Sequence, residues 1–236
     1  MASSDTTPRA EVPGWRAPLL LLAAAVAVFA FRPLGGEAVD QAFQSLFWDG
    51  ASWALPREHP VLHPLLYDGP KALLILLALL LVAGAAAPAR FPSWLGRRRS
   101  LYLLACLALV PVASTQLRAV TRMATPAATE TYGGPWPHRL LFESKPEGYP
   151  SNAFPAGHAS GGYSLLALAF AWEGSRRRRA GAAVGLAAGS AMGLYQVARG
   201  EHFLSHTLAT VLLAWLLCAL LARWMRPASL SAPTSS

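Results

Sequence analysis

The chain has 236 residues, of which 54% are hydrophobic and only 14% are charged, and its formal net charge is +8. A soluble domain of this size needs less apolar material, and here the apolar residues gather in long runs. The arginines lie in short loops beside those runs, so the positive charge indicates membrane topology and argues against nucleic acid as a partner. The sequence therefore predicts an all-α, polytopic membrane protein.

Six apolar runs are candidates for membrane-spanning helices: 15–31, 71–89, 101–118, 160–173, 180–198 and 203–224. At about 1.5 Å per residue, roughly 20 helical residues cross the hydrocarbon core of a bilayer. The first run could instead belong to a signal peptide, but no clean small-x-small cleavage site follows it. We expect six spans in one membrane-embedded domain, residues 15–226, between disordered tails at 1–14 and 227–236.

The loops between the runs differ in charge. Arginines cluster before the first run and after the second, fourth and sixth: Arg9, Arg16, Arg97, Arg98, Arg99, Arg176, Arg177, Arg178, Arg179, Arg223 and Arg226. The positive-inside rule places these loops and both termini in the cytoplasm. The opposite loops, 32–70, 119–159 and 199–202, hold all six histidines together with the adjoining helix ends: His59, His63, His138, His158, His202 and His206. Cys106 and Cys218 lie inside apolar runs, where we expect small buried side chains without redox or metal chemistry.

The first of the histidine-bearing loops contains the stretch EAVDQAFQSLFWDGASW. Val39, Phe43, Leu46 and Phe47 recur there at helical spacing, and two tryptophans follow. This pattern predicts an amphipathic helix lying in the membrane interface. A lid that packs over the bundle without contacting lipid is the alternative.

The loop before the last run places three polar groups together. In YQVARGEHFLSHTLAT, Arg199, His202 and His206 are spaced three and four residues apart, so on a continuous helix they share one stripe. Unpaired ionisable groups beside lipid are costly, which favours a ligand, and the arginine fork suits a phosphate. His158 follows Gly157 where the fourth run begins, and the free N–H groups of a helix N-terminus also favour an anion.

Three ordered motifs resemble those of the type 2 phosphatidic acid phosphatase superfamily, whose members are six-span lipid phosphate phosphatases. PAGH (155–158) is similar to the family's PSGH, GEHFLSH (200–206) resembles the second half of SRxxxxxHxxxD, and RAVTRMATP (118–126) loosely matches KxxxxxxRP. The resemblance covers roughly residues 40–220. Departures are Thr125 for arginine, Ala156 for serine, Gln196 for arginine and His206 for aspartate. Arg122 and Arg199 lie within one helical turn of two lost arginines, and Glu201, Glu143 or Glu147 are candidates for the lost carboxylate.

Carried over residue by residue, the resemblance implies a covalent mechanism. His202 is the nucleophile that becomes phosphohistidine, His158 is the general acid and base, and His206 occupies the carboxylate position of the catalytic set. Arg118, Arg122, Arg199 and Gly157 would hold the phosphate, and no metal or other cofactor is required. The implied substrate is an envelope lipid such as lipid A, undecaprenyl diphosphate or phosphatidylglycerol phosphate.

The implied location is the bacterial inner membrane, with the active site on the periplasmic face. Two alternatives remain open. One is a non-catalytic lipid-phosphate binder, because the third-motif aspartate is missing. The other is a zinc or haem site built on His158, His202 and His206.

Overall fold

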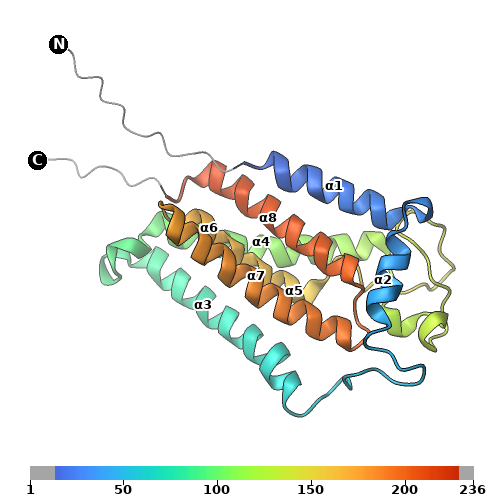
Figure 1. Cartoon of the computed structure of the whole chain (residues 1–236). Helices are drawn as coiled ribbons and strands as arrows, with labels where there is room; N and C mark the ends of the chain where they lie inside the picture. The colour runs from blue at the N-terminus through green and yellow to red at the C-terminus, as the bar shows by residue number, and fades with distance from the viewer. Residues whose placement is uncertain (1–13, 229–236) are drawn as a thin grey trace, which may run out of the picture.

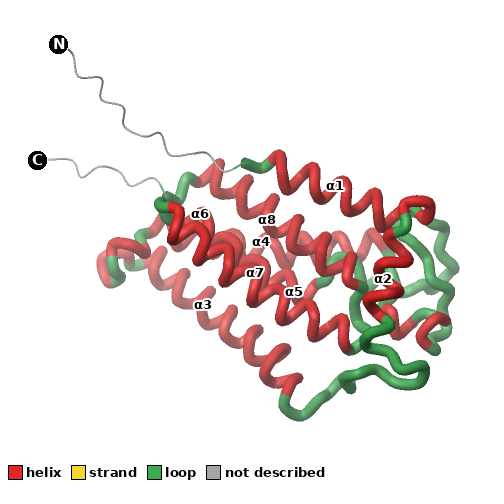
Figure 2. The backbone as a smooth tube through the Cα atoms, in the orientation of Figure 1, coloured by secondary structure: helices red, strands yellow, loops and turns green. Residues whose placement is uncertain are grey.

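The computed structural model describes residues 14–228, and this part of the chain is helical, without a β-strand (Figures 1 and 2). The all-α prediction is confirmed. The predicted tails fall almost entirely on 1–13 and 229–236, which lie outside the described residues. The α-helices are α1 (Arg16–Ala30), α2 (Gly36–Gln44), α3 (Gly69–Ala86), α4 (Arg97–Thr121), α5 (Gly157–Ser164), α6 (Leu168–Ala171), α7 (Ser175–Ala198) and α8 (Leu204–Met225).

Short helical turns connect these helices. The π-helical turn η2 (Pro64–Asp68) runs directly into α3, and η7 (Leu165–Ala167) joins α5 to α6. The remaining turns are η1 (Arg32–Leu34), η3 (Pro88–Arg90), η4 (Ser93–Leu95), η5 (Pro126–Ala128) and η6 (Glu130–Tyr132). The fourth apolar run is thus not one regular helix but the sequence α5, η7 and α6.

Each of the six apolar runs forms helix, and three helical segments are long and apolar enough to cross a membrane: Pro64–Ala86, Arg97–Ala128 and Leu204–Met225. The helix Arg16–Ala30 is apolar but shorter. These segments fit the predicted membrane protein, whereas the count of six spans stays a prediction. On α3 the leucines and isoleucine that would face lipid are largely exposed, as expected for a helix at the edge of the bundle (Figure 1).

The centre of the bundle is close-packed around α4. Tyr102, Cys106 and Val110 are fully buried there, and they belong to one core with Ala214 and Cys218 of α8. Both cysteines are free and buried, which confirms their prediction as small core residues. The Tyr102 hydroxyl donates to the Cys218 carbonyl oxygen at 3.1 Å, so the buried phenol is satisfied within the core.

A stripe of glycines on α7 sets how closely α5 and α6 approach it. A Cβ on Gly181 would lie 2.5 Å from the carbonyl carbon of Leu168, and one on Gly185 would lie 2.4 Å from the backbone nitrogen of Leu166. Small residues every four positions let helix backbones meet at this distance. Gly162 of α5 meets Gly189 of α7 in the same way, where a Cβ on Gly162 would lie 2.7 Å from the Gly189 Cα, so α5 with His158 in its first turn is held against α7.

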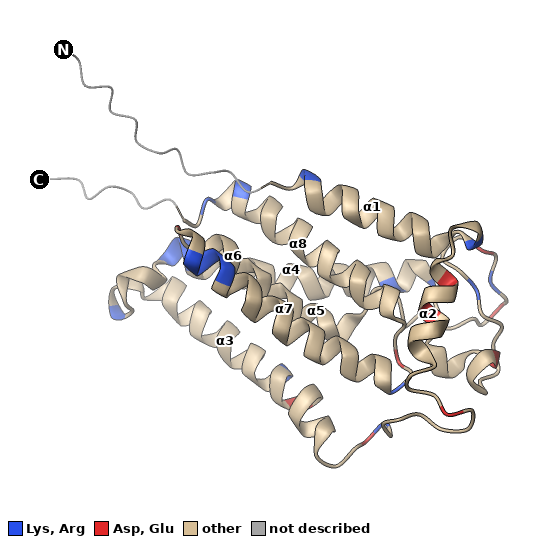
Figure 3. Cartoon of the chain, in the orientation of Figure 1, with Lys and Arg blue, Asp and Glu red and all other residues tan. Residues whose placement is uncertain are grey.

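Arginines cluster at the end of the bundle where α7 begins and α8 ends (Figure 3). Most of the acidic residues lie near α2 and in the loops at the opposite end, whereas Glu173 lies beside the arginines. The charge asymmetry expected from the loop sequences is therefore also present in three dimensions. The two ends of the bundle differ in chemistry, and the candidate site lies at the end away from the arginine clusters.

Candidate functional site

The site begins with the turn between α7 and α8. Arg199, His202 and His206 would share one stripe only on a continuous helix, and this condition is not met: α7 ends at Ala198 and α8 begins at Leu204, with the expected turn between them. Gly200 breaks the helix with a φ of +73°, a conformation that glycine adopts without a Cβ penalty. A Cβ there would also lie 2.4 Å from the ring of Trp53, so the turn is packed under that indole.

His202 is buried in this turn, with 5% of its surface exposed. Its ring lies 5.8 Å from that of His206, centroid to centroid, and nearly perpendicular to it. Burial lowers the pKa of His202 to about 3, and the positive charges of Arg118 and His158 act in the same direction against the backbone of Ala153. His202 is therefore neutral at pH 7, with a lone pair available on the ring.

Arg118 lies directly against the first turn of α5. A Cβ on Gly157 would fall 2.6 Å from Cζ of Arg118 and 2.7 Å from its Nη1, so only glycine leaves room for the guanidinium. Arg118 donates to Thr115 Oγ1 at 3.2 Å, while its Nε is buried without a partner in the described chain. The guanidinium and the helix N-terminus thus present positive charge at one point.

Arg199 approaches the same region from the end of α7. It is 7% exposed and lies over the ring of Tyr195, with Cζ 4.9 Å from the centroid. Its Nη1 donates to Gln196 Oε1 at 3.5 Å, so the residue lies beside the position of the lost motif arginine. The same Cζ is 5.9 Å from the ring of Tyr67.

His158 is held by the π-helical turn η2. Its Nε2 is 3.0 Å from the carbonyl oxygen of Leu66, and its ring stacks on Tyr67 at 4.1 Å with an interplanar angle of 9°. Tyr67 in turn stacks on His63 at 4.7 Å. Because a carbonyl only accepts, His158 Nε2 must carry a proton in this arrangement.

The other expected residues lie elsewhere. Arg122, which ends α4 with a φ of +47°, is exposed and donates to the Pro146 carbonyl oxygen at 3.4 Å. Of the three candidate carboxylates, Glu201 pairs with Arg57 at 2.6 Å. Glu143 pairs with Arg32 at 2.6 Å, and Glu147 is exposed.

Sequence reasoning missed Asp40 of α2. One carboxylate oxygen accepts from the Ser205 backbone N–H at 2.8 Å and the other from the Ser205 hydroxyl at 2.5 Å, so Asp40 ties α2 to the first turn of α8. Burial raises the pKa of Asp40 to about 6, and the Ser205 bonds oppose this shift. The sequence signal was only the four-residue spacing of Asp40 and Gln44, which puts both on one helix face. In the structure Gln44 donates to the Val197 carbonyl oxygen at 2.7 Å.

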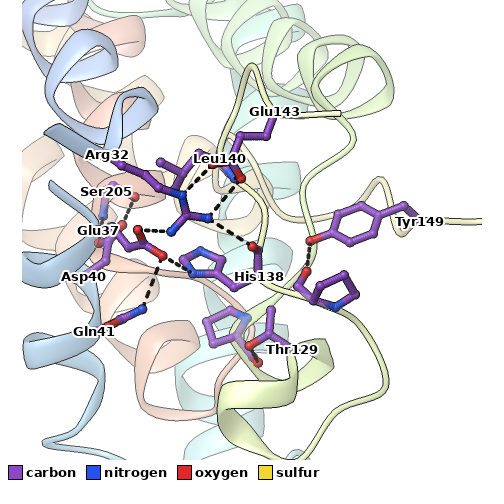
Figure 4. Close-up of polar contacts among 12 residues, drawn as sticks. Arg32, Glu37, Asp40, Gln41, Thr129, His138, Leu140, Glu143, Tyr149 and Ser205 are labelled. Carbon is purple, nitrogen blue, oxygen red and sulfur yellow. Dashed lines mark hydrogen bonds and ion pairs between the residues drawn. The ribbon is translucent and has the colours of Figure 1, made fainter. Parts of the chain in front are cut away.

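A second polar cluster joins η1 and α2 to the loop that carries His138 (Figure 4). His138 Nδ1 lies 3.0 Å from Glu37 Oε1, and Arg32 pairs with both Glu37 and Glu143. Burial lowers the pKa of His138, with Glu37 opposing. The Arg32–Glu143 pair likewise lowers the pKa of Glu143.

Several buried polar atoms around the turn have no partner among the described residues: Arg118 Nε, Arg199 Nε, His202 Nδ1, His206 Nδ1, Tyr195 Oη and Thr207 Oγ1. Buried polar groups in proteins are nearly always hydrogen-bonded. Two arginines, neutral imidazoles and a helix N-terminus are donors suited to the oxygens of a phosphate. Among residues 14–228, no group of three or more His, Cys, Asp or Glu side chains is placed to hold a metal ion, so the three-histidine alternative finds no such cluster there.

Comparison with known proteins agrees with this arrangement. A family model described as PAP2 superfamily matches residues 99–229, which is more than half of the chain. No curated protein and no solved structure gives a match. The matched range includes Arg118, Gly157, His158, His202 and His206, whereas α2 and the turn η2 lie before it.

Proposed function

The chain belongs to the PAP2 superfamily, and on this premise we propose that it is an integral membrane phosphatase that removes phosphate from a lipid phosphate. Members of the superfamily are phosphatases, so activity on phosphate esters follows from the family. The lipid nature of the substrate and the face of the membrane are part of our proposal.

One observation carries the proposal: Arg118, packed on Gly157, and Arg199 lie near two histidines at one end of the bundle. The charges of Arg118 and His158 both act on His202, and that of Arg199 acts on His158. The unpartnered Nε atoms of Arg118 and Arg199 are donors for the equatorial oxygens of a transferring phosphoryl group. A merely structural cluster would have satisfied these nitrogens internally.

The proposed reaction has two steps. A ring nitrogen of neutral His202 attacks phosphorus, the P–N bond forms as the P–O bond to the lipid breaks, and His158 gives its proton to the leaving oxygen. His158 then takes a proton from water, the water oxygen bonds to phosphorus, and the P–N bond breaks to release inorganic phosphate. Neither step requires a metal or another cofactor.

An apolar groove supports a lipid substrate. It has a volume of about 410 Å³ and lies between α3 and α4, with Leu74 and Leu107 among its lining residues. Gly157, His158 and Lys71 also line it, so one groove contains both an apolar surface and the general acid. A lipid with its phosphate at His158 would place its chains along the apolar part.

The surface of α2 supports a site at the membrane interface. Asp40 and Gln44 point into the protein, whereas Val39 is 51% exposed and Leu46, just beyond the helix end, is 70% exposed. Apolar side chains outward and polar ones inward fit a helix that contacts lipid. With the arginine clusters in the cytoplasm and six spans, both termini would lie inside, and our proposal puts the site on the periplasmic face of a bacterial inner membrane.

The test is phosphate release from a panel of lipid phosphates in detergent with EDTA present. The panel contains lipid A, undecaprenyl diphosphate and phosphatidylglycerol phosphate, and the variants are His202→Ala and His158→Ala. We expect release by the wild type and at least a 100-fold loss in each variant, as for removal of a general acid or nucleophile. His59→Asn is the matched control, because His59 only accepts backbone N–H bonds in its own turn.

Three results would contradict the proposal. If the wild type releases phosphate from none of the lipids, the protein is better explained as a non-catalytic binder. Loss of activity in EDTA would instead require a metal. Full activity of His202→Ala would rule out a phosphohistidine intermediate at His202.

A further inference from the structure

The chain has no carboxylate at the third-motif aspartate position, which is His206. Glu143 and Glu201 form ion pairs with Arg32 and Arg57, and Glu147 is exposed. His206 itself is 1% exposed and its Nδ1 is buried without a partner in the described chain. His202 Nδ1 is likewise buried without a partner in the described chain. The backbone of Ala153 acts on both imidazoles, and a further group that pairs with the unpartnered nitrogens can set their tautomers.

Glu37 and His138 form a pair that supplies such a group. The 3.0 Å contact between His138 Nδ1 and Glu37 Oε1 places the proton on Nδ1, because the carboxylate only accepts (Figure 4). Since burial lowers the pKa of His138, the ring is neutral at pH 7 and its Nε2 is an acceptor. An imidazole held in this way can replace a carboxylate as the acceptor for another histidine.

His138 and His206 face a shared cavity. Its volume is about 30 Å³, which is enough for one water, and Asp40 and Ser205 also line it. Both rings pack against Phe203, at centroid distances of 5.1 Å for His138 and 5.4 Å for His206.

The groups that face His206 come from three elements. His202 lies in the turn before α8, His138 in the loop before α5, and Asp40 on α2. Each oxygen of Asp40 accepts one hydrogen bond from Ser205, so Asp40 holds the start of α8 in place. His138 lines this cavity with Nε2 as its acceptor nitrogen, because its Nδ1 is bound to Glu37.

We propose that Glu37 and His138 are positioning residues that act on His202 through a water in the cavity and through His206, in place of the third-motif aspartate. His206 donates toward His138 by way of the water and accepts from His202 Nδ1. The opposite nitrogen of His202 is then the nucleophile. This inference rests on the proposed phosphatase function.

The test is a double-mutant cycle with His206→Asp, which restores the family's carboxylate beside His202. In the wild-type background, which has His206, His138→Gln and Glu37→Gln should each lower kcat about tenfold or more, as loss of an orienting partner does. In the His206→Asp background, the same two substitutions should lower kcat less than about threefold, because position 206 no longer depends on them.

A matched control separates orientation from structure. Glu143→Gln removes the other carboxylate that pairs with Arg32 and leaves the His138–Glu37 contact in place, so kcat should stay within about twofold of the wild type. Thermal unfolding of each purified variant checks that it is folded. A purely structural role would give equal losses in both backgrounds and would overturn the inference.

Two further outcomes are distinguishable. Inactivity of His206→Asp alone would show that position 206 does not serve the carboxylate role, and would also overturn the inference while leaving the phosphatase function standing. Inactivity of the wild type on every lipid phosphate would overturn the proposed function, and this inference with it.

Discussion

At the scale of single residues, the site depends on close contact between a guanidinium and a glycine. The Arg118 fork occupies the space that a Cβ on Gly157 would need, so the arginine and the first turn of α5 form one anion-binding surface. The family motif requires glycine here, and the contact with Arg118 gives the physical reason in this chain.

We therefore expect Gly157→Ala to displace the Arg118 side chain and to lower kcat/KM at least about 100-fold, as loss of a transition-state donor does. The measurement is the steady-state rate on whichever lipid phosphate the wild type hydrolyses. Gly96→Ala is the control, because its Cβ would meet only the Ser93 carbonyl oxygen at 3.6 Å. Equal activity of Gly157→Ala and the wild type would show that Arg118 does not bind the phosphate.

At the scale of elements, the π-helical turn η2 connects the site to α3. Leu66 and Tyr67 of this turn contact His158, and the chain continues directly into the helix that lines the apolar groove. π-helical turns are rare and are frequent at functional sites. The turn therefore links the general acid to the wall along which we propose that a lipid enters.

Removing the stacked ring should disturb His158 more than removing its hydroxyl. We expect Tyr67→Ala to lower kcat about tenfold and to shift the pH–rate profile, since the ring stabilises the imidazolium form of His158. Tyr67→Phe keeps the stacking and should stay within about twofold of the wild type. Similar losses in both variants, with an unchanged pH profile, would contradict this role for the ring.

At the scale of the whole molecule, the two ends of the bundle are chemically different. The arginine clusters lie at one end and the candidate site at the other (Figure 3). If the bundle crosses a bilayer as proposed, we expect the candidate site and the positive loops to face different compartments.

The orientation is testable with single cysteines in a chain lacking Cys106 and Cys218. Glu147 lies in the loop near the site and Glu173 lies between α6 and α7, and both are exposed. In intact cells, a membrane-impermeant thiol reagent should label Glu147→Cys and should label Glu173→Cys only after permeabilisation. The reverse pattern would place the site in the cytoplasm.

The sequence alone determined the helical class, the approximate position of each helix and the motif residues. These properties are local: apolar runs of the right length form helices in a membrane, and Gly157 and His158 mark a helix start because of their neighbours in the chain. The two buried cysteines were likewise predictable from the runs that contain them.

Tertiary structure alone decided which polar groups meet. Arg199, His202 and His206 gather around the turn where Gly200 breaks the helix, and they do not share one helical stripe. The carboxylates also required the fold, because Asp40 reaches Ser205 across 165 positions of sequence, and Glu37 of α2 reaches His138 in the loop before α5. Helical periodicity relates residues within a few turns, whereas contacts between helices depend on packing geometry that no short pattern in the sequence encodes.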